Sequence, residues 1–121
     1  MLTLTNRYAM HILDYQKLEE LFAANPSRLT LVLTTVQERI PQWQEEIATA
    51  MDSGNPQTIR TISHAIRGTA GTIRAERLEA AAAAWAEMAK SGNTAETTTA
   101  YQGLSTALQE LADFINHSET T

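Results

Sequence analysis

The fold is decided by residues 55–75, which read NPQTIRTISHAIRGTAGTIRA. Asn55 is a good helix N-cap and Pro56 suits the first helical position, so this stretch predicts a helix that begins at residue 56. Its apolar residues recur at steps of three and four, which places them on one face of that helix. They are Ile59, Ile62, Ile66, Ala70 and Ile73. The short break at residues 74–75 then makes the next helix run back antiparallel to this one.

The rest of the chain has the same helical periodicity, and strand signals are nearly absent. Asp14 is expected to cap a short helix, and Asn25 and Pro26 to begin a long one that bends near residues 36–40 because of Pro41. The expected apolar stripes are Leu18, Leu21 and Phe22; then Leu29, Val32, Val36, Ile40, Trp43, Ile47 and Met51; then Leu78, Ala81, Trp85 and Met88; and finally Tyr101, Leu104, Leu108, Leu111 and Ile115. The sequence therefore predicts an all-α protein, an antiparallel four-helix bundle with an additional short N-terminal helix.

Length and composition fit one folded domain. The chain has 121 residues, of which 43% are hydrophobic and 19% charged, a balance typical of a globular chain and not of a disordered one. We assign residues 1–121 to a single domain, with an irregular lead over residues 1–13 and a frayed tail over residues 117–121.

Charge and cysteine content exclude several classes of function. Nine Lys and Arg against 14 Asp and Glu give a net charge of −5, so the chain lacks the basic field that binds nucleic acid or anionic lipid. The absence of cysteine removes disulfides, thiolate metal sites and cysteine nucleophiles. No apolar run approaches the roughly 20 residues that span a bilayer. We expect a cytoplasmic protein that neither binds nucleic acid nor inserts into a membrane.

One face of the helix after Pro56 is not explained by folding. At about 100° per residue, His64 projects roughly 160° from the middle of the apolar stripe, so it points away from the core. Projected near it are Arg60, Thr61, Arg67, Gly68 and Gly71. Each glycine inside a helix costs about 1 kcal/mol relative to alanine, but small residues beside a nucleophile would clear the approach of another macromolecule. The arginines could neutralise phosphoryl oxygens, whereas Ser63 is expected to be a surface or locally hydrogen-bonding residue.

The stretch His64-Ala-Ile-Arg67-Gly68-Thr-Ala70, followed by Ile73 and Ala75, resembles the motif of the histidine-containing phosphotransfer (HPt) domain of bacterial phosphorelays. The helix order around the motif resembles that family over most of the chain. Two positions depart from the family pattern. Arg67 stands where the family usually has lysine, and Arg74 stands where it usually has glycine, so a left-handed backbone at Arg74 would carry a modest strain.

This resemblance implies a phosphorelay intermediate in two-component signal transduction. His64 would accept a phosphoryl group from a receiver-domain aspartate and pass it to another receiver aspartate. Arg67 and Gly68 are assigned to the catalytic site with His64, and Arg60, Thr61 and Gly71 to partner binding. The residues leave the phosphorylated ring nitrogen open, and the resemblance implies Nε2. The expected partners are response-regulator receiver domains, with a hybrid sensor kinase as a further candidate, and we expect a monomer.

No cofactor or metal site is expected in this chain. We expect Mg²⁺ on the carboxylates of the receiver partner, because no carboxylates here have plausible ligand spacing. The sequence lacks a GxxxxGK[ST] loop, so we expect no ATP binding, no autokinase activity and no enzyme in the usual sense. A four-helix metal or redox enzyme needs Glu-x-x-His pairs, and the residue three before His64 is Thr61. The alternative left open is a non-catalytic helical adaptor that docks receiver or kinase domains, although the presence of His64 favours transfer.

Overall fold

The computed structural model describes residues 10–120, so most of the expected irregular lead (residues 1–9) and Thr121 lie outside the described residues. Within residues 10–120 five helices follow one another: α2 (Tyr15–Leu21), α3 (Pro26–Ser53), α4 (Pro56–Thr72), α5 (Glu76–Ser91) and α6 (Thr94–Thr120). Between residues 10 and 120 no strand is present. The all-α prediction is confirmed.

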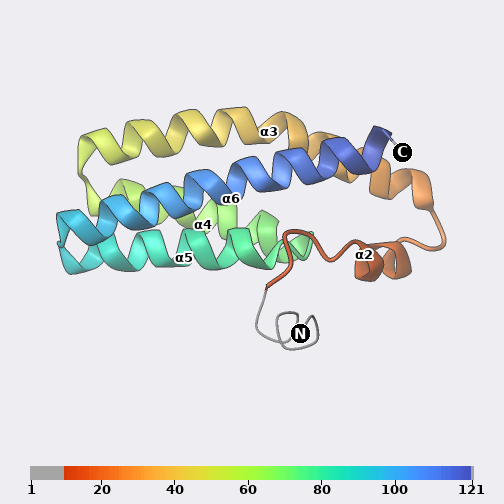
Figure 1. The fold of residues 1–121 in the computed structure, drawn as a ribbon, viewed down its shortest axis with the longest axis horizontal. Coiled ribbons are helices and arrows are strands. Elements are labelled where there is room, and N and C mark those ends of the chain that lie inside the picture. The colour runs from red at the N-terminus through yellow and green to blue at the C-terminus, as the bar shows by residue number, and fades with distance from the viewer. Residues whose placement is uncertain (1–9, 121) are drawn as a thin grey trace.

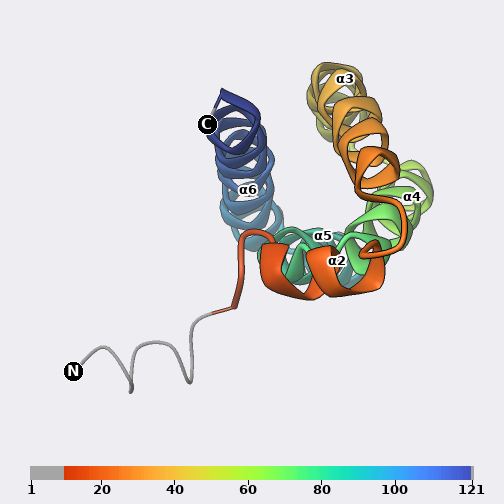
Figure 2. The same cartoon turned by 90° about the vertical axis from the view of Figure 1, so that its right-hand side faces the viewer.

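The four long helices form an antiparallel bundle. Figure 1 shows α3 to α6 lying alongside one another with alternating directions. In the end-on view of Figure 2 they surround a common centre, with α2 across the end of the bundle below α3. Helix α4 packs between α3 and α5, and α6 closes the ring by packing against both α5 and α3. This is the expected four-helix bundle with a short N-terminal helix.

The expected breaks between helices have the expected chemistry. The Asp14 side chain accepts a hydrogen bond from the Lys17 amide at 3.2 Å, and the Asn55 side chain accepts one from the Gln57 amide at 2.9 Å. Gly54 ends α3 with a left-handed φ of 64°, a conformation that glycine adopts at little cost. Helix α3 runs unbroken through Pro41, and its ribbon changes direction in the half before that residue (Figure 1).

The core follows the predicted stripes with small rotations, except in α2, where Leu18 is buried but Leu21 is 57% exposed. Val32 and Met51 are half-buried, whereas Leu33 and Ala50 are fully buried in α3. This rotation follows from the packing of α3 against α4 and α6 on different sides, because a helix that packs on two sides buries a wider arc than one stripe. The largest fully buried side chains are Trp85, Leu18, Leu33, Ile40, Ile47, Ile59, Ile66, Ile73, Leu78, Leu104, Leu108 and Leu111.

The C-terminal end differs from the sequence prediction. We expected a frayed tail from residue 117, but α6 is helical to Thr120. Two contacts hold its last turns against the bundle. Ile115 is fully buried, and the Gln37 side-chain amide on α3 donates a hydrogen bond to the Asn116 side-chain oxygen at 2.7 Å.

Residues 10–13 are irregular but attached to the bundle at the turn between α4 and α5. The His11 amide donates to the Glu76 carboxylate at 3.0 Å, and the Arg77 amide donates to the His11 carbonyl, also at 3.0 Å. Leu13 is buried. This segment therefore satisfies an amide in the first turn of α5, whose N-cap residue Ala75 supplies no side-chain hydrogen bond.

Candidate functional site

Helix α4 presents His64 to solvent. The helix buries Ile59, Ile66 and Ala70 against the core, and His64 is exposed, as the helical projection predicts. The periodicity that forms the core thus fixes the direction of the imidazole.

Ser63, the residue before His64, corrects a prediction. We expected it at the surface or in a local hydrogen bond, but it is only 1% exposed and its hydroxyl donates to the Ala82 carbonyl of α5 at 2.6 Å. The prediction was wrong because Ser63 projects only about 60° from the centre of the apolar stripe, on the side where α5 packs. This bond ties α4 to α5 directly beside His64.

Two grooves meet at His64. The first runs between α3 and α4, and we call it the apolar groove; it is lined by Asn25, Ser27, Arg28, Leu31, Val32, Thr35, Val36, His64, Ala65, Gly68, Thr69, Thr72 and Ile73. Leu31 is the most exposed large hydrophobic residue in the described part of the chain, at 66%. A leucine that exposed contributes little to folding, and its side chain lines the same groove as His64.

The second groove runs between α4 and α5, and we call it the basic groove. It is lined by Pro56, Gln57, Arg60, Ser63, His64, Arg67, Ala83, Ala86, Glu87 and Lys90. Arg60, Arg67 and Lys90 are exposed, and between residues 10 and 120 no ion pair joins any of them to a carboxylate. His64 therefore lies on a ridge between the apolar groove, which also contains Arg28, and the basic groove with Arg60, Arg67 and Lys90.

The structure separates the predicted site residues into three groups. Arg60 and Arg67 line the basic groove with His64, and Gly68 lines the apolar groove. A Cβ added at Gly68 would meet nothing within 4 Å, so the surface there is open. Thr61 is exposed, lines neither groove, and donates its hydroxyl to the Gln57 carbonyl at 3.0 Å.

Gly71 is in a different position from Gly68. It is half-buried, and a Cβ there would lie 3.5 Å from the Glu79 carboxylate of α5, which is ordinary van der Waals contact. Gly71 lines neither groove. It therefore lies under a side chain of the same protein, away from the open surface around His64.

Sequence reasoning missed the contributions of α3 and α5 to this face. Leu31 could have been found as a leucine off the apolar stripe of its helix. Lys90 could have been found from the antiparallel arrangement of α4 and α5. The short turn between these helices places the middle of α5 opposite Ser63, so the C-terminal end of α5, where Lys90 lies, is near Pro56 at the start of α4. Both belong to a site built from three helices.

Within residues 10–120, no group of three or more His, Asp or Glu side chains gathers in a way that could hold a metal ion. In the same part of the chain, no helix is long and apolar enough to cross a membrane.

Comparison with known proteins identifies the family. Residues 29–114 match the Hpt domain, which is most of the chain and includes His64. The chain therefore belongs to the Hpt domain family, whose members are phosphotransfer carriers, and it is a histidine phosphotransfer intermediate of two-component phosphorelays. Members of this family interact with the receiver and kinase domains of such phosphorelays.

A solved structure has the same fold. The crystal structure of histidine-containing phosphotransfer protein B from Pseudomonas aeruginosa PAO1 superposes with a TM-score of 0.79, at 16% sequence identity, over 89% of this chain and 94% of that one. At that identity the likeness concerns the fold. No curated protein sequence matches this chain.

Proposed function

We propose that His64 is the phosphoacceptor of this Hpt domain. The observation that carries the proposal is its position: the imidazole is exposed on α4, on the ridge between the two grooves. Gly68, one turn further along α4, leaves the surface beside it open. A bulky partner can therefore bring its reactive group against the ring without displacing a side chain of this protein.

The proposed reaction is a reversible transfer between aspartate and histidine. A ring nitrogen of neutral His64 attacks the phosphorus of an aspartyl phosphate on a receiver domain. The N–P bond forms, the acyl P–O bond breaks, and the electron pair of that bond leaves with the aspartate as carboxylate. The other ring nitrogen releases its proton to water. The reverse attack by a second receiver's carboxylate on the phosphohistidine completes the relay, and positioning and charge neutralisation are the protein's main contributions.

Arg67 and Arg60 supply the charge neutralisation in this proposal. Both line the groove that contains His64, and guanidinium groups pair well with phosphoryl oxygens.

Magnesium is assigned to the carboxylates of the receiver partner, which bind such ions, and no cofactor or ATP is assigned to this chain. We place the protein in the cytoplasm, a reducing compartment with which the absence of cysteine is compatible. We infer that it acts as a monomer, because its described helices already bury their apolar stripes within one chain.

The apolar groove is the proposed docking site for the receiver. Leu31 and Val32 of α3 offer apolar surface there, adjoining Ala65 and Gly68 of α4. A partner that must place its aspartate at His64 necessarily covers the adjoining surface. Docking on this groove would bury Leu31, and burial of a leucine side chain contributes about 1.5–3 kcal/mol.

The proposal is tested by phosphotransfer with a panel of receiver domains. Each receiver is first phosphorylated with a small-molecule phosphodonor and then mixed with the protein. We expect phosphate on the protein that is labile in acid and stable in base, and none on His64→Gln. His117→Gln is the matched control, because His117 is an exposed histidine on α6 that lines neither groove. Label that persists in His64→Gln would overturn the assignment, and receiver binding without label would favour the adaptor.

A further inference from the structure

One carboxylate lies among the cations of the basic groove. Glu87 of α5 is exposed and lines the groove together with His64, Arg60, Arg67 and Lys90. Between residues 10 and 120 no ion pair joins Glu87 to any of these cations. Its negative charge therefore has no direct partner that neutralises it, and it acts on any charge that enters the groove.

The ends of α5 explain its other charged residues in this part of the fold, but not Glu87. Glu76 and Glu79 are in the first turn and Lys90 is in the last, where charges of those signs are favoured by the helix dipole. Glu87 lies near the C-terminal end, where a negative charge gains nothing from the dipole. Glutamine forms helices about as well as glutamate, so the helix accounts for a long polar residue here and not for its charge.

Glu87 extends toward the part of the groove that contains His64. Helices α4 and α5 are antiparallel (Figure 1), and the hydrogen bond from Ser63 to Ala82 sets their register. Helical side chains lean toward the N-terminus of their own helix, so Glu87 leans toward Ala83, one turn earlier on the same face. On that side of Glu87, α5 lines the groove with Ala83 alone, and no bulky side chain of α5 separates the carboxylate from the histidine.

Phosphorylation of His64 would bring a strongly negative group into this groove. A phosphoryl group carries roughly −1.5 to −2 charges at neutral pH. Arg60 and Arg67 attract such a group, whereas Glu87 repels it, and this repulsion raises the free energy of the phosphorylated protein. The unphosphorylated imidazole experiences no such repulsion, so the charge of Glu87 changes the free-energy difference between the two forms.

We infer that Glu87 raises the phosphoryl-transfer potential of phosphorylated His64, so that the phosphoryl group passes to the next receiver more readily. The inference rests on the proposed function of His64. In the transfer, the receiver's carboxylate attacks the phosphorus, the N–P bond breaks, and the ring nitrogen leaves with the electron pair while the other ring nitrogen regains a proton from water. Arg60 and Arg67 act in the opposite direction, and the balance of these charges sets the equilibrium of the relay step.

The test measures the equilibrium of transfer, using the full chain and the receiver that labels His64 most rapidly. The forward and reverse second-order rate constants are measured, and their ratio is the equilibrium constant between the free proteins, from which the strength of docking cancels. We expect Glu87→Gln to shift this constant about threefold toward phosphorylated His64 at about 0.01 M salt. At about 1 M salt the shift should fall below about 1.5-fold, because the Debye length decreases from about 30 to about 3 Å.

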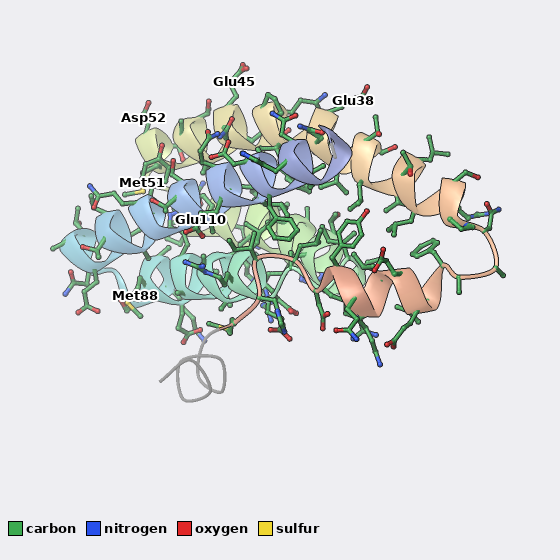
Figure 3. All side chains as sticks on the ribbon, turned by 45° about the vertical axis from the view of Figure 1, so that its right-hand side comes forward. Glu38, Glu45, Met51, Asp52, Met88 and Glu110 are labelled. Atoms are coloured by element: carbon green, nitrogen blue, oxygen red, sulfur yellow. The ribbon has the colours of Figure 1, made fainter. Side chains whose placement is uncertain are left out.

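Two further variants identify the cause of the shift. Glu87→Lys should move the constant about tenfold at the lower salt, because reversing the charge doubles the change in free energy. Glu45→Gln is the control and should leave the constant unchanged. It removes the same charge from the outer side of α3, where Figure 3 shows Glu45 directed away from the bundle and outside both grooves. Circular dichroism checks that each variant keeps its helical fold.

The inference would be overturned by equal constants for Glu87→Gln and Glu45→Gln, by a shift toward the phosphorylated receiver, or by a shift that persists undiminished at the higher salt. In each of these cases labelling of wild-type His64 would leave the proposed function standing. The absence of that label would refute the function itself.

Discussion

Gly68 and Gly103 are two exposed glycines inside helices. Replacing each of them separates the effect of a glycine on stability from its effect on phosphotransfer. A Cβ at either position would meet nothing within 4 Å, so each can be replaced without a clash. Gly68→Gln and Gly103→Gln should both stabilise the protein, by about 0.5–1 kcal/mol, because glycine is a poor helix former. Thermal unfolding followed by circular dichroism measures this gain.

Only Gly68→Gln should affect transfer. Its side chain would enter the space beside His64, so we expect the rate of phosphotransfer from the receiver to fall at least about tenfold, which corresponds to about 1.4 kcal/mol of lost docking or transition-state stabilisation. Gly103 lies on α6, outside both grooves at His64, so Gly103→Gln should transfer at the wild-type rate. Equal rates for the two variants would show that Gly68 does not clear the approach to His64.

The turn between α4 and α5 contains the main backbone strain in residues 10–120. Arg74 has a φ of 60°, and it is the sole non-glycine residue with positive φ in the described chain. The Ala75 amide donates back to the Ala70 carbonyl at 2.8 Å, and the Asp14 amide donates to the Arg74 carbonyl at 3.0 Å. This is the helix-ending arrangement that normally uses glycine, and it confirms the left-handed conformation considered from the sequence. The surrounding hydrogen bonds hold an arginine in it.

Replacing Arg74 should therefore relieve strain in one variant and not in its control. Arg74→Gly should be about 0.5–1 kcal/mol more stable than Arg74→Ala, because both remove the charged side chain but only glycine removes the Cβ that opposes positive φ. The difference remains after the larger unfolded-state entropy of glycine is subtracted. Urea denaturation of the two variants measures it, and an alanine variant as stable as the glycine variant would contradict strain at this turn.

At the level of elements, local signals were sufficient for the helices but not for the contacts between them. Caps such as Asn55 and Gly54 act on their own helix ends, so sequence alone predicts them. The buried hydroxyl of Ser63 and the hydrogen bonds between His11 and α5 depend on how separate parts of the chain pack against one another. The same limit applies to the site: periodicity predicts that His64 is exposed beside Arg67 and Gly68, but Leu31 and Lys90 reach this face only through packing of α3 and α5.

The whole molecule has one face that differs from the rest of its surface. His64 lies where the apolar and basic grooves meet, whereas the outer side of α3 carries exposed acidic residues (Figure 3). The net charge of −5 therefore describes the average surface and not the surface that a partner meets. A receiver docked on this face would contact three helices, and the relative placement of α3, α4 and α5 becomes part of recognition.

A Leu31 variant tests whether a docked receiver covers the apolar groove. At 66% exposure it is largely outside the core, so Leu31→Gln should leave the midpoint of thermal unfolding nearly unchanged. If a receiver buries Leu31, its loss should weaken receiver binding about tenfold, as expected from about 1.5 kcal/mol of lost apolar burial. Met10→Gln is the control, because Met10 is an exposed hydrophobic residue at 49% in a groove between α5 and α6. Calorimetric titration with the unphosphorylated receiver measures both, and equal affinities for the two variants would place the receiver elsewhere than on the apolar groove.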